Sequence, residues 1–566
     1  MREWLQETHG PDFELLRHFV LRLFDSELST TRDQWKTPAI GALSLLLPWF
    51  PLYAQQVLMG KYARFSALAM PGPYRQAVRA DELWLLTLMM SGVGLVTAVK
   101  WQSLFPGLRD YQVLGTLPLR GRQIFQAKFL ALLIVSTIAV IVIGGLPCLI
   151  FPLVSGGRWQ INPSLAAHLA VQAIAVASSC YFFFFGLLAL QGVLLNLLPP
   201  QHFGQVTGYL QGLLVAAMLI LIVLSFSIDT RFLPTALRPQ LSAWLPPVWF
   251  LGLQQHLLGE PDPVMAALAR RAEAGLAIAV VLALLCYIAG YRRHRKLLVE
   301  GSSGASKGDR KWTGALLEWL VPDPRQQAIL VFMSKTLARS SQHRMILMGY
   351  GGFGLAILIS GIIGMEEAVS EPNRTAACFV YAHVILLTFL LIGLRHLFTI
   401  PVELKANWTF QIAERQGRMD WMRAVDRFTL FWGAVLMLAT PLPIEARLLG
   451  WRAVAEVGLF AAFGLLCYEW VFASWQKLPF TCSHLPGKIP AWILTLWGIG
   501  ILSALPLVNG LLLVSLYHPI AYVVIFGVIV AIWLGLYSTR RQGFGELRLT
   551  YDDLPDPAIH GLNLLR

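Results

Sequence analysis

The run FLALLIVSTIAVIVIGGLPCLIFPL, residues 129–153, contains no charged side chain. A helix needs about 20 mainly apolar residues to cross the hydrocarbon core of a bilayer, and the core of a soluble protein does not require runs of this length. The run therefore predicts a transmembrane helix, which we place at residues 125–153.

The composition of the whole chain points the same way. Of its 566 residues, 56% are hydrophobic and 14% are charged, whereas roughly a quarter of the residues of a soluble domain are charged. The net charge of +13 would suit a nucleic-acid partner. However, the Lys and Arg residues lie between the apolar runs, where membrane topology places them. We therefore expect a membrane protein with no nucleic-acid partner.

Eleven further apolar runs are also long enough to predict transmembrane helices. The expected fold class is an all-α polytopic membrane protein with about twelve transmembrane helices, arranged as two six-helix halves with amphipathic interfacial helices. The predicted spans are residues 38–58, 82–100, 125–153, 165–198, 205–228, 272–291, 345–364, 376–396, 428–446, 454–475, 490–508 and 519–539.

The two halves repeat one plan: a short amphipathic helix, two spans, a long basic inner loop and four more spans. Apolar stripes predict the amphipathic helices, with Leu15, Leu16, Phe19, Val20, Leu23 and Phe24 in the first half and Ile329, Phe332, Met333 and Leu337 in the second. The predicted parts are a first half at 1–296 with an inner loop at 101–128, a Gly/Ser-rich cytoplasmic linker at 297–325, a second half at 326–541 with an inner loop at 398–428, and a C-terminal tail at 542–566.

The distribution of Lys and Arg predicts the orientation, because these residues are enriched in cytoplasmic loops. With the N-terminus inside, the inner segments hold 33 of the 45 Lys and Arg residues. The first outer loop runs against the rule, since it contains Lys61, Arg64, Arg75 and Arg79. The N-terminal segment lacks the apolar run and cleavage site of a signal peptide. We expect both termini to be cytoplasmic.

Few residues within the spans suggest chemistry. His168, His383 and Glu469 are candidates to line a translocation path or to relay protons, although hydrogen bonds between helices would explain each of them equally well. The segment LPPVWFLGLQQHLLG, residues 245–259, predicts an outer-face helical hairpin that either gates an exit or lies at the membrane surface.

Motifs for catalysis or nucleotide binding are absent from the sequence. Gly60-Lys61 and Gly487-Lys488 lack the upstream Gly and the following Ser or Thr of a phosphate-binding loop. The sequence has no HExxH motif and no GxSxG elbow, since its one GxSxG match, GASKG at residues 304–308, falls in the Gly/Ser-rich stretch between the two halves. Its six cysteines form no metal-like cluster. We expect a protein that is not an enzyme and binds no metal or other cofactor itself.

The two long inner loops are the most informative segments. LFPGLRDYQVLGTLPLRGRQIFQAK, residues 104–128, and FTIPVELKANWTFQIAERQGRMDWMRAVDRF, residues 398–428, both interleave apolar and charged side chains. A mere connection needs few residues, since median loops have about 4–6. Both loops therefore predict surfaces on which another protein docks.

The run RDYQVLGTLPLRGRQIFQAK, Arg109 to Lys128, resembles the first inner loop of permease subunits from type-2 ATP-binding-cassette exporters. IPVELKANWTF, residues 400–410, and LPFTCSHLPGK, residues 478–488, are similar to segments of long, fused bacterial members of that family. The chain departs from simpler members by fusing two six-span halves, which puts homodimerisation in doubt.

The resemblance implies an export permease of the bacterial cytoplasmic (inner) membrane that works with two copies of a separate ATPase, on which ATP and Mg would bind. It also implies that each inner loop forms a coupling helix on that partner. The residues that would couple are Arg109, Asp110, Tyr111, Leu114 and Leu117 in the first half and Glu403, Ala406, Asn407, Trp408 and Phe410 in the second.

Two other functions fit parts of the sequence. A secondary transporter driven by an ion gradient would also have two sets of six spans, but only Glu469 stands clearly inside a predicted span as a carboxylate. A membrane-embedded lipid-modifying enzyme would need converging acid, base or metal ligands, and the sequence does not bring such a set together.

Overall fold

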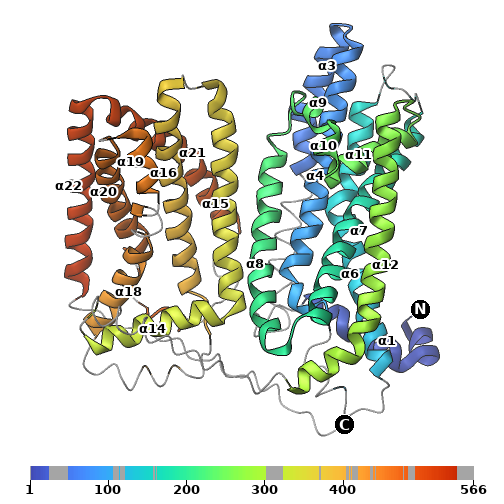
Figure 1. The fold of residues 1–566 in the computed structure, drawn as a ribbon, viewed down its shortest axis with the longest axis horizontal. Coiled ribbons are helices and arrows are strands. Elements are labelled where there is room, and N and C mark those ends of the chain that lie inside the picture. The colour runs from blue at the N-terminus through green and yellow to red at the C-terminus, as the bar shows by residue number, and fades with distance from the viewer. Residues whose placement is uncertain are drawn as a thin grey trace. The chain divides into compact units, whose positions relative to one another are not determined.

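The computed structural model describes most of the chain. The described residues are 2–24, 49–105, 114, 121–156, 160, 162, 164–300, 321, 323–368, 371–402, 407, 410, 418–433, 438–439, 441–450, 452–473, 475, 477–481 and 491–544. All regular structure in these residues is helical (Figure 1), which confirms the predicted all-α fold class.

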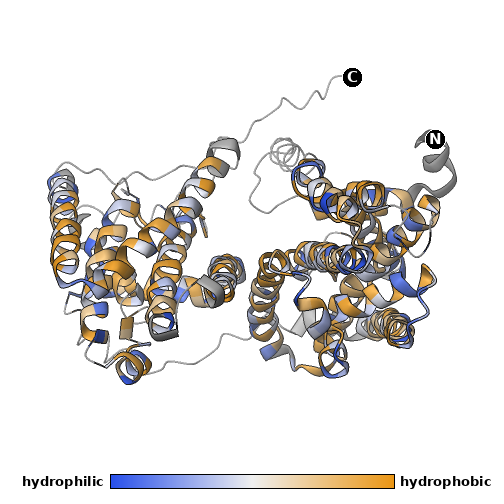
Figure 2. Ribbon diagram, turned by 90° about the horizontal axis from the view of Figure 1, so that it is seen from above, coloured by the Kyte–Doolittle hydropathy of each residue, from blue (hydrophilic) through white to orange (hydrophobic). Residues whose placement is uncertain are grey.

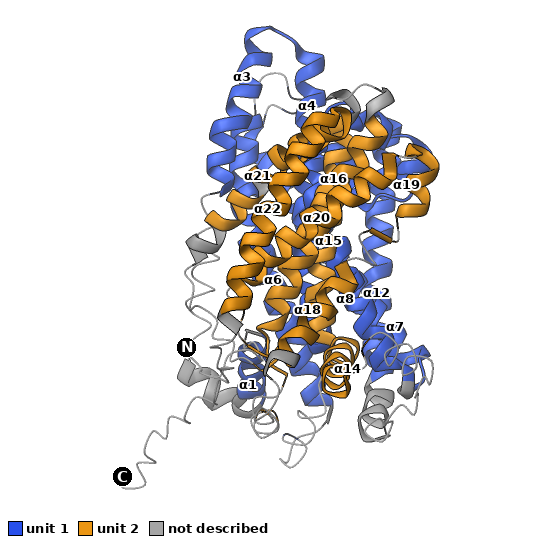
Figure 3. Cartoon of the chain, turned by 90° about the vertical axis from the view of Figure 1, so that its left-hand side faces the viewer, with its two compact units in different colours: residues 1–306, 486–491 blue, residues 307–485, 492–566 orange. Residues whose placement is uncertain are grey.

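The chain divides into two compact units (Figure 3). Unit 1 comprises residues 1–306 and 486–491, and unit 2 comprises residues 307–485 and 492–566. The division between residues 306 and 307 falls inside the segment 297–325 that the sequence predicts as a linker.

The helices of unit 1 are, in chain order, α1 (Arg2–Phe24), the π-helical turn η1 (Ala54–Leu58), α3 (Met59–Ala67), α4 (Pro71–Val99), the 3-10 turn η2 (Trp101–Ser103), α6 (Gly121–Ser155), α7 (Leu165–Leu197), α8 (Pro200–Ser225), α9 (Phe232–Ala236), α10 (Pro239–Ser242), α11 (Pro246–Leu257) and α12 (Pro263–Glu300).

The helices of unit 2 are α14 (Pro324–Arg339), α15 (Ser341–Ala368), α16 (Glu371–Phe398), α18 (Arg418–Gly433), α19 (Leu442–Leu449), α20 (Arg452–Phe472), α21 (Ala491–Tyr517) and α22 (Pro519–Phe544).

Ten helices within the described residues are long and apolar enough to cross a membrane. In unit 1 they cover Pro71–Val99, Arg122–Ser155, Leu165–Leu197, His202–Ser225 and Pro263–Gly290. In unit 2 they cover Ser341–Met365, Arg374–Phe398, Arg452–Phe472, Leu496–Tyr517 and Pro519–Gln542. These helices match ten of the twelve predicted spans.

The other two predicted spans, 38–58 and 428–446, run into residues outside the described part of the chain. Residues 25–48 are not described, and the helical chain that follows continues through η1 into α3. Residues 434–437 and 440 are likewise not described, between the end of α18 and the start of α19. The count of twelve therefore stays a prediction.

The outward faces of both units carry apolar side chains, visible as orange ribbon in Figure 2. On α12 the exposed residues Ile278, Val281, Leu285 and Ile288 lie three or four positions apart, on one helical face. On α22 Ile520 is 82% exposed. Apolar surface on this scale is what lipid chains cover in a membrane protein.

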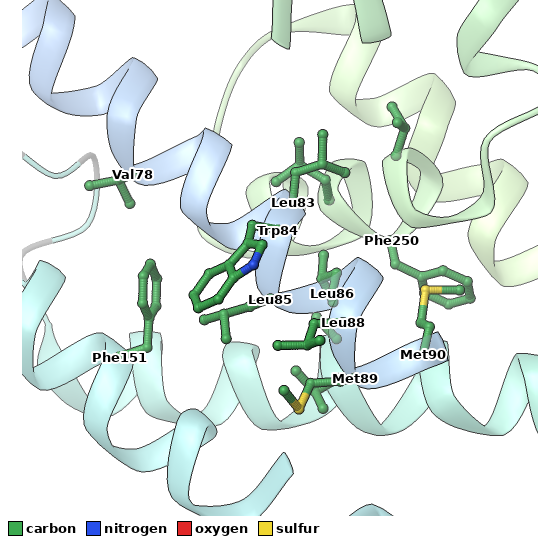
Figure 4. Packing of buried hydrophobic residues seen from close by; sticks show 14 of the residues in the cluster. Val78, Leu83, Trp84, Leu85, Leu86, Leu88, Met89, Met90, Phe151 and Phe250 are labelled. Carbon is green, nitrogen blue, oxygen red and sulfur yellow. The ribbon is translucent and has the colours of Figure 1, made fainter. Parts of the chain in front are cut away.

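Helix α4 forms the centre of unit 1. Every residue from Asp81 to Ser91 is buried, because α4 is packed against α6, α7, α8 and α11. Figure 4 shows its side chains meeting Phe151 of α6 and Phe250 of α11. A helix that is apolar on all sides is expected in the interior of a bundle.

The two predicted amphipathic helices are present, and each packs its apolar stripe on its own unit. Leu15, Phe19 and Leu23 of α1 are buried in one core with Trp101 and Phe125. In Figure 1, α14 lies across the ends of other unit 2 helices. Its residues Ile329, Leu330 and Met333 are buried with Trp421, Val425 and Phe428 of α18.

Candidate functional site

A small cavity lies inside unit 2, between α16, α18 and α20. Its volume is about 210 Å³. The wall is largely apolar and contains three polar side chains, His383, Thr429 and Tyr468. On α16 and α20 the lining residues include positions spaced four apart, which share one helical stripe: His383, Leu387 and Leu391, and Phe460, Gly464 and Tyr468.

His383 stands at the cavity wall and is held from several sides. Its Nδ1 lies 2.9 Å from the carbonyl oxygen of Phe379, one turn earlier on α16. Its Nε2 lies 3.2 Å from Oε1 of Glu445. The imidazole ring stacks on Phe460 of α20, with 4.7 Å between the ring centroids. These contacts fix the ring and direct Nε2 towards a carboxyl group.

Two carboxyl groups are buried near His383. Glu445 is 0% exposed and lies in the first turn of α19, within the predicted span 428–446. Glu456 of α20 is 1% exposed and interacts electrostatically with Glu445. Glu445 thus contacts His383 and lies within electrostatic range of Glu456, in apolar surroundings.

Tyr468, which also lines the cavity, belongs to an ionic cluster. Its hydroxyl donates a short hydrogen bond to the carboxylate of Asp426 on α18. Arg540 of α22 donates to Asp426 Oδ1 at 2.7 Å and to Glu469 Oε2 at 3.0 Å. The guanidinium of Arg540 also lies 5.1 Å from the centroid of the Tyr468 ring. This cluster joins three helices, α18, α20 and α22, through charge-assisted hydrogen bonds.

The three predicted candidates for a translocation path therefore have different surroundings. His168 in unit 1 bonds through Nε2 to the carbonyl oxygen of Asn162, at 2.8 Å, in the segment just before its own helix. Glu469 pairs with Arg540 across helices. Of the three, His383 alone lines the 210 Å³ cavity. Their role in transport stays a prediction.

The expectation that Glu469 is the only carboxylate clearly inside a span is wrong for the helices described. Asp81 lies inside α4 because that helix begins at Pro71 rather than near residue 82, and Glu82, the first residue of the predicted span, lies inside it as well. Glu456 lies inside α20. All three are buried. The scarcity of intramembrane carboxylates is therefore no argument against an ion-driven mechanism.

Buried polar groups at one end of unit 1 satisfy one another. Lys61 of α3 donates to Asp81 at 2.8 Å, and Tyr62 donates to the same carboxylate at 2.6 Å. Burial and the neighbouring Asp81 raise the pKa of Tyr62 well above its usual range, so its hydroxyl remains a donor. Arg79 forms a short ion pair with Glu260. Two of the four basic residues that break the topology rule thus have acidic partners.

The segment predicted as an outer-face hairpin contains α11. This helix is largely buried against α4, α7 and α12, and Val248, Phe250 and Leu251 are each at most 1% exposed. Gln254 donates to Gln172 of α7 at 2.6 Å, and Gln255 bonds Glu82 of α4. Helix α11 is thus an integral part of the unit 1 core rather than a helix lying on its surface.

Three of the ten predicted coupling residues are described, and all three pack against their own unit. Leu114 is 8% exposed and belongs to the core beneath α1. Asn407 donates its side-chain amide to the carbonyl oxygen of Thr481, at 2.9 Å. Phe410 packs between Phe332 of α14 and Trp421 of α18. The other seven lie outside the described residues: Arg109, Asp110, Tyr111, Leu117, Glu403, Ala406 and Trp408.

Sequence reasoning missed most partners of the unit 2 site. Asp426 and Arg540 are 114 positions apart, and no local pattern links them. Glu456 could have been found, because it begins the four-residue spacing that continues through Phe460 and Gly464 to Tyr468. Such a stripe, with an acid at one end and a phenol at the other, indicates a helix face that is not turned to lipid.

Comparisons of the chain with protein-family models, with curated proteins and with solved structures find no match. Within the described residues, no three His, Cys, Asp or Glu side chains lie close enough to hold a metal ion. The interpretation of the site therefore depends on its own geometry.

Proposed function

We propose that this chain is the membrane-spanning permease of an export system, driven by ATP that a separate subunit hydrolyses. The observation that carries the proposal is a basal platform found in both units. We use this term for α1 with Leu114 and the start of α6 in unit 1, and for α14 with Phe410 and α18 in unit 2.

The two platforms have the same construction. In each, an amphipathic helix packs its apolar stripe on the helix that follows the inner loop, and a side chain from that loop packs with the same core, buried in unit 1 and partly buried in unit 2. Leu114 plays this part in unit 1, and Phe410 and Asn407 play it in unit 2. A loop anchored in this way transmits force to the bundle, because packed side chains do not yield independently.

This packing separates the loop residues that contact their own unit from those that are available to a partner. Leu114, Asn407 and Phe410 act as anchors towards their own unit, so the contact with a partner falls to other residues of the same loops. Two copies of a partner ATPase match two platforms. Because the sequence has no phosphate-binding loop, ATP and Mg would bind to the partner.

The proposed cargo is hydrophobic or lipid-like. A second, larger cavity of about 730 Å³ opens among α16, α20, α21 and α22, with a wall that is almost wholly apolar. Trp470 and Trp497 line it and are 55% and 59% exposed. Its volume lies within the roughly 300–1,000 Å³ of sites for small molecules.

Photo-crosslinking in membranes of the native host tests the platform assignment. Trp408 is replaced by the photoreactive residue benzoylphenylalanine, and Trp244, which is 83% exposed in unit 1, is replaced in the same way as a control. We expect Trp408 to yield a crosslink to an ATPase with a phosphate-binding loop, and ATP with vanadate to change the yield. A crosslink only to lipid or to the same chain would reject the assignment.

Charge reversal provides a functional readout. The double variant with Asp110→Lys and Glu403→Lys is expected to insert normally and to lose ATP-dependent export. Normal export by this variant would show that neither inner loop couples ATP hydrolysis to transport.

A secondary transporter driven by an ion gradient is the second candidate. The observation that favours it is the buried group of His383, Glu445 and Glu456, since ionisable residues within membrane proteins often mark ion pathways. Transport abolished by a protonophore and unaffected by vanadate would favour this function over the first.

A further inference from the structure

We propose that the 210 Å³ cavity of unit 2 holds water, and that this water connects a proton-binding site formed by His383, Glu445 and Glu456 to the Tyr468–Asp426 end. The inference goes beyond the proposed permease function, since it requires neither an ATPase nor a transported substrate.

The charge of the buried site requires bound protons. Were both carboxyl groups ionised beside a neutral imidazole, two negative charges would lie in apolar surroundings without compensation, which is strongly unfavourable. One proton shared between His383 Nε2 and Glu445 Oε1, which are 3.2 Å apart, neutralises one carboxylate. A second proton on Glu456 neutralises the other. The site therefore holds and exchanges protons.

Other charged and titratable groups lie around the site. Tyr517 is within electrostatic range of both Glu456 and Arg452. Arg452 lies 5.8 Å from the centroid of the Tyr517 ring. On α15, Tyr350 bonds His396, several turns along α16 from His383. Asp426 and Arg540 belong to the Tyr468 end.

The bound species is a proton rather than a metal ion. The described residues contain no group of three His, Cys, Asp or Glu side chains with metal-binding geometry. A metal bound by a His and one carboxylate alone would have most of its coordination positions unfilled.

Thr429 indicates that the cavity contains water. Its side chain lines the cavity and is 0% exposed. Its hydroxyl has no hydrogen-bond partner among the described residues, although a buried polar group without a partner is destabilising. The cavity of about 210 Å³ has ample room for several waters, since each occupies about 30 Å³ in the liquid. Thr429 and Tyr468 supply polar contacts for such waters, and the His383–Glu445 pair lies at the same wall.

The Tyr468 end gives this water an exit. Tyr468 lines the cavity and donates its hydroxyl hydrogen to Asp426. The Asp426 side chain is 24% exposed, whereas those of His383 and Glu445 are 4% and 0% exposed. A proton leaving the buried site would therefore pass through cavity water to the Tyr468 hydroxyl. Tyr468 would pass its own hydroxyl proton to Asp426, which would release it to solvent, so that each O–H bond broken is replaced by a new one.

The test uses the full chain in lipid nanodiscs and infrared difference spectroscopy of protonated carboxyl groups. We expect a carboxylic-acid band at pH 7 that is lost in Glu456→Gln. We also expect the band to shift rapidly after transfer to D₂O, because cavity water carries the exchange. A band unchanged in Glu456→Gln would overturn the proposed protonation of Glu456.

A filling substitution tests the water route separately. A Cβ at Gly433 in the cavity wall meets no described atom within 4 Å, so Gly433→Leu is chosen to place a larger side chain at this wall. Gly500→Leu makes the same change in the wall of the apolar cavity, where a Cβ likewise meets no described atom within 4 Å. We expect Gly433→Leu to slow deuterium exchange several-fold and Gly500→Leu to leave it unchanged. Equal exchange rates in both variants would reject the cavity as the route.

These outcomes are independent of the permease proposal. Loss of the ATPase crosslink would leave the carboxyl band and its exchange unaffected, and an unaltered band in Glu456→Gln would leave the platform experiment intact.

Discussion

Arg540 bonds two carboxylates from different helices, Asp426 of α18 and Glu469 of α20. Its side chain is 5% exposed, so these charges lie largely out of water. When one partner of a buried ionic cluster is removed, the remaining charge is left uncompensated, and this costs more than the cluster itself contributes. Residues in such clusters are therefore sensitive to replacement.

Replacement of Arg540 tests this dependence. Arg540→Gln is expected to lower the free energy of unfolding by about 3–5 kcal/mol, measured by thermal or denaturant unfolding in detergent. Arg541→Gln, at the exposed next position, is expected to change it by less than about 0.5 kcal/mol. Adding Asp426→Asn and Glu469→Gln to Arg540→Gln is expected to recover much of the loss. No recovery would show that the lost stability comes from packing rather than charge.

At the scale of elements, α7 and α12 approach each other closely at Gly192. A Cβ at this position would lie 2.6 Å from the Cβ of Cys286, a distance that carbon atoms do not adopt without displacement. Asn196 Nδ2, one turn further along α7, donates to the carbonyl oxygen of Cys286 at 3.3 Å. Small residues at such crossings allow membrane helices to pack by direct backbone contact.

Two glycines of α7 provide a matched test of this crossing. Gly192→Ala is expected to destabilise the protein by about 1–3 kcal/mol through overpacking. A Cβ at Gly186 meets no described atom within 4 Å, so Gly186→Ala is expected to be neutral or to stabilise by up to about 1 kcal/mol. Unfolding temperatures in detergent compare the two. Equal effects would mean that the helices separate readily at Gly192.

Apolar runs predicted the existence of the helices well, because crossing a bilayer dictates both length and composition. They predicted the ends less well: α4 begins at Pro71, eleven positions before the predicted start. Hydropathy could not include Arg79 and Asp81 in that helix, since each is compensated by a residue distant in the sequence. His383 could be identified as a candidate because it stands in an apolar run. Its partner Glu445 could not, because the two residues are distant in the sequence.

At the scale of the whole molecule, the sequence predicts that the linker and both termini lie on the cytoplasmic side. Unit 1 offers an exposed reference position at the opposite end of its spans, Trp244, which is 83% exposed. The predicted orientation places Trp244 outside the cell and the linker inside.

Cysteine labelling of the full chain tests this orientation. In a variant without the native cysteines, Trp244→Cys is expected to react with a membrane-impermeant maleimide in intact cells. Gly304→Cys in the linker and Asn563→Cys in the tail are expected to react only after the membrane is permeabilised. Labelling of Gly304→Cys in intact cells would show that the orientation is the reverse of the predicted one, with the basal platforms outside the cell.

The ionic cluster of Arg540 also has a consequence for biosynthesis. The ribosome makes Asp426 and Glu469 before Arg540, which lies 71 positions after Glu469. Until α22 has been inserted, the nascent chain therefore holds two acids at the α18–α20 contact without their guanidinium. Completion of unit 2 should thus wait for its last helix, and a chain stalled before residue 540 should be a preferred substrate for membrane quality-control proteases.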